Sequence, residues 1–61
     1  MLTRLQKERL ERYKKRLEMY YEAEEAVLLN QEYTIGTKSL KRADLSTIRA
    51  AIKDLEKQIE S

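Results

Sequence analysis

The segment YTIGTKSLKRAD, residues 33–44, restricts the fold more than any other part of this 61-residue chain. It contains the only glycine, and the chain has no proline, so the long segments on either side can each form an unbroken helix. Gly36 and Thr37 fit the central positions of a type II′ turn, which needs glycine first. This register pairs Tyr33 with Leu40 and gives the two strands one apolar face. We therefore expect a two-stranded β-hairpin at about residues 33–40.

Apolar residues on both sides of this hairpin recur at alternating spacings of three and four, the pattern of one helix face. The first helix is expected over about residues 3–29, with Thr3 as N-cap and Asn30 in the left-handed conformation after its end. The second is expected over about residues 42–60. The fold class is therefore α+β and mostly helical: two antiparallel helices joined by a short two-stranded β-hairpin, in one domain spanning residues 1–61. The expected core consists of Leu10, Tyr13, Leu17, Tyr20, Val27, Leu28, Tyr33, Ile35, Leu40, Leu45, Ile48, Ile52, Leu55 and Ile59.

Two positions in this scheme need a polar partner. Glu24 falls on the apolar face of the first helix, so it requires either a partner or a place at the edge of the core. The second helix lacks an ordinary N-cap, because the lysine at position 41 cannot accept a hydrogen bond. We expect Ser39 or Asp44 to serve the free N–H groups at this end, where a carboxylate also suits the positive end of the helix dipole.

The two expected helices differ in length. At 1.5 Å per residue they would be about 40 Å and about 28 Å long, so roughly two turns of the first would extend past the second. Leu2 and Leu5 fall in this overhang without an evident partner in the chain, and Met19 and Leu29 lie off the main apolar face. Single exposed apolar residues are common and need no special role. The alternative is a second contact face for subunits or partners, whose candidate residues are Leu2, Leu5, Arg12, Lys15, Arg16, Met19 and Leu29.

The formal net charge of +2 hides an uneven distribution. Residues 1–16 hold seven Lys or Arg and two Glu, which gives +5, whereas residues 17–32 hold five Glu and no cation, which gives −5. Such polarity can guide assembly between copies or attract an acidic partner. As a set, the basic residues project around most of the first helix, and the tyrosines lie on the expected core faces. A nucleic-acid surface is therefore an alternative rather than the main interpretation.

The composition also excludes several kinds of chemistry. There is no cysteine and no histidine, which removes disulfides, thiolate chemistry and the usual general base. We interpret the cluster of Glu22, Glu24 and Glu25 as solvated helix surface rather than a cation site. We expect no enzymatic activity, cofactor, metal or small-molecule ligand. No apolar run approaches the roughly 20 residues that cross a bilayer, so we expect a soluble protein without a membrane partner.

The arrangement helix–YTIGTKSLKRADL–helix resembles that of small tailed-phage and prophage proteins of the gpW family. The resemblance covers residues 33–52 well and the first helix only in character. It implies a fold of two antiparallel helices and one hairpin, and a role in head completion or head–tail joining as a ring under the portal. The matching residues are Tyr33, Thr34, Ile35, Gly36, Ser39, Leu40, Arg42, Ala43, Asp44, Leu45, Ile48, Arg49 and Ile52.

The chain departs from that family pattern in two places. Lys41 stands where relatives often have a capping Thr or Ser. The sequence also ends at the second helix, whereas gpW proteins continue into a tail that is implicated in tail attachment. The resemblance further implies a homo-oligomer, the portal or other phage neck proteins as partners, and a location in the host cytoplasm during assembly and then in the virion.

Three functional hypotheses follow. The first is a non-enzymatic phage or prophage structural protein of the head–tail connector or head-completion type, which acts as an oligomer through protein–protein contacts. The second is a small nucleic-acid-binding accessory protein that uses the basic N-terminal half. The third is a helical hairpin that dimerises as a generic adaptor. Oligomer size separates the first from the third, and binding to DNA that weakens steeply with salt identifies the second.

Overall fold

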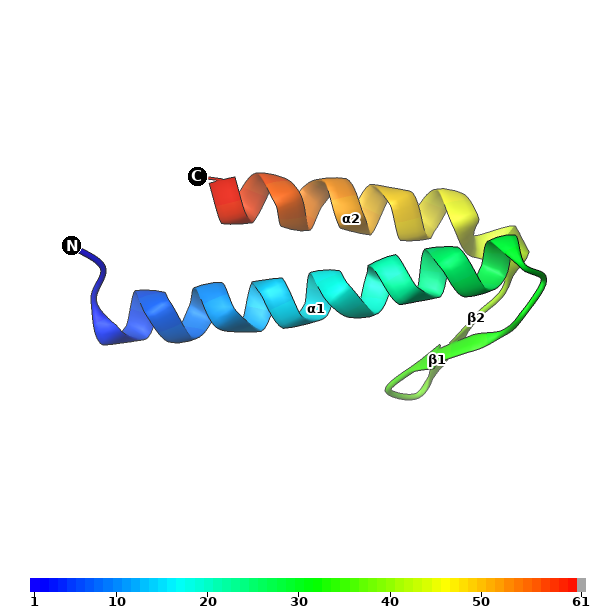
Figure 1. Cartoon of the computed structure of the whole chain (residues 1–61), viewed down its shortest axis with the longest axis horizontal. Helices are drawn as coiled ribbons and strands as arrows, with labels where there is room; N and C mark the ends of the chain where they lie inside the picture. Colours follow the sequence, from blue (N-terminus) through cyan, green and yellow to red (C-terminus); the bar gives the residue numbers. More distant parts are fainter. Residues whose placement is uncertain (61) are drawn as a thin grey trace.

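The structure is a computed structural model that describes residues 1–60. Its elements are α1 (Arg4–Leu28), β1 (Tyr33–Ile35), β2 (Lys38–Leu40), a short 3₁₀ helix η1 (Arg42–Asp44) and α2 (Leu45–Glu60). In Figure 1, α2 runs antiparallel along one side of α1, and the hairpin lies along the other side of the C-terminal half of α1. The molecule measures 43 × 19 × 15 Å, because α1 extends past the end of α2. The expected fold class is confirmed, and Ser61 lies outside the described residues.

Helix α1 is capped at both ends by its own sequence. The Thr3 hydroxyl accepts a hydrogen bond from the Gln6 N–H at 3.1 Å, and the Gln6 side chain accepts one from the Thr3 N–H at 2.8 Å, which is a capping box. At the other end, Asn30 has a φ of 60°. The Gln31 N–H donates to the Ala26 carbonyl at 2.8 Å and the Asn30 N–H to the Val27 carbonyl at 3.1 Å, which is a Schellman motif. The predicted roles of Thr3 and Asn30 are confirmed.

The hairpin has the predicted register, with Tyr33 opposite Leu40 in an antiparallel pair. Gly36 has a φ of 62°, whereas Thr37 is not among the residues with positive φ, as a type II′ turn requires. A Cβ added at Gly36 would meet nothing within 4 Å, so the backbone angle rather than space favours glycine here. Gly36 and Thr37 therefore act as the turn that reverses the chain between β1 and β2.

The start of the second helix differs from the prediction. Residues 42–44 form a 3₁₀ turn, and α2 begins only at Leu45. The Asp44 carboxylate accepts a hydrogen bond from the Lys41 N–H at 3.0 Å, so Asp44 serves this end as expected. Ser39, the alternative candidate, instead donates its hydroxyl hydrogen bond to the Glu32 carboxylate at the base of the hairpin. The 3₁₀ turn of residues 42–44 connects β2 to α2, although the side chain at position 41 cannot accept a hydrogen bond as an N-cap would.

The core is concentrated where the hairpin meets the two helices. Ala23, Val27 and Ile48 are completely buried, and Leu40 is 2% exposed. The partly buried residues packed against this cluster are Leu17, Tyr20, Tyr33, Ile35 and Leu45. Further along the helix pair, Ile52 and Leu55 are buried, whereas Leu10, Tyr13 and Ile59 are only half-buried. The molecule therefore has a closed end at the hairpin and an open end near the two termini.

Two of the core assignments need correction. Leu28 was expected inside, but 43% of it is exposed, because the last turn of α1 extends past the start of α2. Ala23 was not expected in the core, although it is completely buried in the cluster that also contains Leu40. Ala23 therefore belongs to the cluster that joins α1 to Leu40 of β2 and to Ile48 of α2.

Candidate functional site

The contact residues predicted on α1 are exposed, as a partner surface requires. Leu5 is 57% exposed, Met19 36% and Leu29 65%. Arg12, Lys15 and Arg16 are also exposed. Arg12 and Lys15 line one open hollow together with Glu8 and Glu11, whereas the other predicted residues are distributed along α1 and its C-cap. The structure therefore offers an elongated surface rather than a binding pocket.

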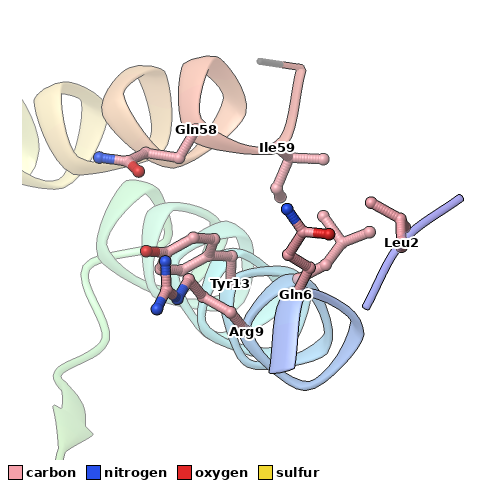
Figure 2. Close-up of a pocket in the computed structure, with 7 residues that line it drawn as sticks. Leu2, Gln6, Arg9, Tyr13, Gln58 and Ile59 are labelled. Atoms are coloured by element: carbon pink, nitrogen blue, oxygen red, sulfur yellow. The ribbon is translucent and has the colours of Figure 1, made fainter. Parts of the chain in front are cut away.

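Leu2 differs from this description. It is half exposed, but it lines a groove of about 370 Å³ at the open end of the molecule, so it has neighbours within the chain. Figure 2 shows Ile59 of α2 pointing toward α1, with Leu2 and Gln6 near it and with Tyr13 and Arg9 on the neighbouring part of α1. The residues before α1 turn toward the end of α2, which brings Leu2 there (Figure 1). The shared groove of Leu2 and Ile59 was not predictable from helix periodicity.

Acidic side chains of the second half of α1 and of the adjoining segment find partners within the molecule. Glu24 forms an ion pair with Arg49 of α2 at 3.1 Å, which supplies the partner that its place on the apolar face required. Glu22 accepts a hydrogen bond from the Tyr33 hydroxyl at 2.7 Å, and Glu32 accepts one from Ser39. These contacts connect α1 to α2 and to the hairpin, and they satisfy part of the local negative charge.

The basic half of α1 has few such partners. Arg4 pairs with Glu8 at 3.5 Å, but both side chains are more than half exposed, so this pair contributes little to stability. Within the described residues, the six other Lys and Arg side chains of residues 1–16 form no ion pair. The positive charge of this half is therefore available to an external partner of opposite charge.

Comparison with known proteins places the chain in a family. The model of a family of unknown function, DUF6148, matches residues 2–61. The chain belongs to this family. The matched residues include both helices and the hairpin. Neither the curated proteins nor the solved structures contain a significant match to this chain.

Two tyrosine hydroxyls of this DUF6148 chain form hydrogen bonds to carboxylates of other elements. The Tyr33 hydroxyl donates to Glu22, and the Tyr21 hydroxyl donates to Glu56 of α2 at 2.8 Å. Each bond requires a protonated phenol beside a carboxylate, so the hydrogen bond raises the pKa of Tyr21 and of Tyr33 above their ordinary value. Tyr21 is 43% exposed, and its hydrogen bond to Glu56 joins the two helices at their surface.

Other kinds of site are not supported within residues 1–60 of this DUF6148 protein. No group of three or more acidic side chains is arranged to hold a metal ion in this part of the chain. None of its described helices is long and apolar enough to cross a membrane. The candidate sites considered below are thus the elongated surface of α1 and the groove at the open end.

Proposed function

We propose that this DUF6148 protein is a non-enzymatic structural protein of a phage or prophage, of the head–tail connector or head-completion type. It acts as a homo-oligomer, and it contacts the portal or another neck protein in the host cytoplasm during assembly and later in the virion. The observation that carries this proposal is the segment of residues 33–52. Its residues resemble the gpW pattern, and it forms the hairpin and helix start that this resemblance implies.

Surface properties of the molecule support a role in protein–protein contact. A chain this short buries a small core, and oligomerisation is a common way to stabilise such domains. Exposed apolar side chains at Leu5 and Leu29 lie at opposite ends of α1. The unpaired cations lie in the N-terminal half of the same helix. A partner that covers α1 would bury both kinds of group.

The test is the mass of the protein by light scattering coupled to size exclusion, measured over a concentration series with and without portal protein. We expect a multimer well above a tetramer, or co-elution with the portal. A dimer or tetramer that does not bind the portal would contradict the connector role and favour the adaptor role. A strict monomer that does not bind the portal would refute both roles.

A nucleic-acid-binding role is the second candidate, and the unpaired cations of residues 1–16 favour it. Such binding would weaken steeply as salt is raised, because phosphate contacts release bound counterions. Fluorescence anisotropy with labelled DNA at low and physiological salt measures this directly. Absence of binding at low salt would remove this candidate.

A further inference from the structure

Three arginines form a stripe along the N-terminal half of α1. Arg9, Arg12 and Arg16 are spaced by three and four residues, so they share one helix face, although the seven cations as a set surround the helix. All three are exposed. Within the described residues none of them forms an ion pair. We call these residues the arginine stripe.

The arginine stripe continues the face that is covered in the other half of α1. Ala23 follows Arg16 by seven residues, about two helical turns, so the two lie on nearly the same face. Ala23 is completely buried in the cluster that contains Leu40 of the hairpin. The hairpin lies along only the C-terminal half of α1, as Figure 1 shows. The same face is therefore apolar and covered in one half of the helix, and basic and uncovered in the other.

The opposite flank of α1 carries a matching acidic stripe. Glu18, Glu22 and Glu25 are exposed and are spaced by four and three residues. Glu18 follows Arg16 by two residues, which turns it roughly 160° around the helix axis. Glu22 accepts the hydrogen bond of Tyr33, whereas Glu18 and Glu25 form no ion pair within the described residues. We call these residues the glutamate stripe.

The two stripes match in length, and their spacings are the same two steps in opposite order: three then four for the arginines, and four then three for the glutamates. In each stripe the first and last residues are seven positions apart, or about 10 Å along the helix. With two α1 helices side by side and parallel, a stagger of nine to ten residues places Arg9 opposite Glu18, Arg12 opposite Glu22 and Arg16 opposite Glu25. This stagger also brings the exposed Met19 of one copy opposite the exposed Leu29 of the next, because these two residues are ten positions apart. Charged and apolar groups then match along one contact.

We propose that the arginine stripe of one copy binds the glutamate stripe of a second copy of this chain. This inference rests on the proposed function and names the contact by which the oligomer forms. The interface is heterologous, because each copy uses two different flanks, and such contacts close into a ring when the rotation between copies permits. A two-fold contact through either stripe alone would oppose like charges and is disfavoured.

The test uses two triple variants that reverse one stripe each, R9E/R12E/R16E and E18K/E22K/E25K. Either variant alone presents two flanks of the same charge, so we expect its dissociation constant for self-association to rise about tenfold or more. An equimolar mixture presents complementary flanks again and should regain the mass of the wild-type assembly. Wild-type assembly should also weaken as ionic strength is raised. The control is K38E/K53E/K57E, which lowers the net charge by the same amount as R9E/R12E/R16E but lies outside α1.

Several outcomes would overturn the proposal. These are a wild-type monomer at all concentrations, variants that associate like the wild type, a mixture that fails to regain mass, or a control that weakens association equally. If the arginine variant loses only binding to a labelled DNA, nucleic acid is the partner instead. Circular dichroism confirms that each variant is folded, and the single variants R12E and E18K replace any triple variant that is not. Portal co-elution of the wild type is scored separately, so failure of this contact leaves the connector role standing.

The orientation of neighbouring helices can be tested with the same chain. It contains no cysteine, so introduced pairs form disulfides without competition. Combining copies with Arg16→Cys and Glu25→Cys should give a cross-linked dimer under oxidation if neighbours are parallel. An antiparallel contact would instead bring Leu5 opposite Leu29, so the pair L5C and L29C would be cross-linked. Formation of the second product in place of the first would overturn the parallel arrangement, which is the one that suits a closed ring.

Discussion

Two isoleucines on the same face of α2 provide a stringent test of where the stability of this fold lies. Ile48 is completely buried at the closed end, whereas Ile59 is half-buried at the edge of the open groove. They differ in burial but not in chemistry or in helix face. Replacing each by alanine removes three carbon atoms, which are worth about 0.8 kcal/mol each when fully buried.

For Ile48→Ala the loss of about 2.4 kcal/mol from burial is increased by the cavity that remains, so we expect a decrease of about 3 kcal/mol in the free energy of unfolding. A chain of this length has a total stability of about 3–9 kcal/mol. The variant should therefore be close to unfolded at room temperature or have a strongly lowered midpoint. For Ile59→Ala we expect about 1 kcal/mol, because the groove already admits solvent.

The measurement is urea unfolding followed by far-UV circular dichroism, at a protein concentration where the wild type is monomeric. Equal slopes for the two variants would show that the change lies in stability rather than in the extent of unfolding. Equal losses for the two variants would refute the distinction between a closed and an open end. A larger loss at Ile59 would indicate that the groove is filled in solution.

Three further predictions test separate features of the fold. Ala23→Leu should lower the unfolding free energy by about 1–3 kcal/mol, because the larger side chain would push the hairpin from α1, and hairpin amide exchange would measure this. Thr3→Ala should cost about 1 kcal/mol and increase amide exchange in the first turn of α1. The wild type should lose stability above about pH 10, and Tyr33→Phe should lose less. The protonated Tyr33 hydroxyl stabilises the fold at lower pH, which raises its pKa, and this contribution disappears as the pH rises through that pKa. Denaturant titrations at neutral and alkaline pH measure the difference, and identical pH profiles for variant and wild type would contradict it.

The candidate contact surface was largely predictable as a set of residues but not as a geometry. Leu5, Met19 and Leu29 were recognised because they lie off the apolar face of a helix, and they are exposed. Arg9, which belongs to the proposed arginine stripe, was not among the predicted contact residues. Its signal was its spacing from Arg12 and Arg16, which has meaning only once the face covered by the hairpin is known. Leu2 was misjudged for a related reason, since the path of the residues before α1 is not periodic.

Local interactions explain what the sequence by itself determined. The helix periods, the capping residue Thr3, the left-handed Asn30 and the Gly36 turn each depend on the steric and hydrogen-bonding preferences of a few neighbouring residues. These preferences act within about one helical turn, so they can be predicted from residues that are neighbours in the sequence. They were sufficient for the order of the elements, the hairpin register and the antiparallel helix pair.

The tertiary structure decided which part of each apolar face became core. The hairpin packs against only the C-terminal half of α1, so it buries Ala23 and leaves the arginine stripe uncovered. Leu28, in the last turn of α1, stays exposed, and Ile59 lies beside an open groove. Whether a side chain is buried depends on which other segments pack against it, and these segments are distant in the sequence. Periodicity alone therefore could not separate the closed end of this molecule from the open one.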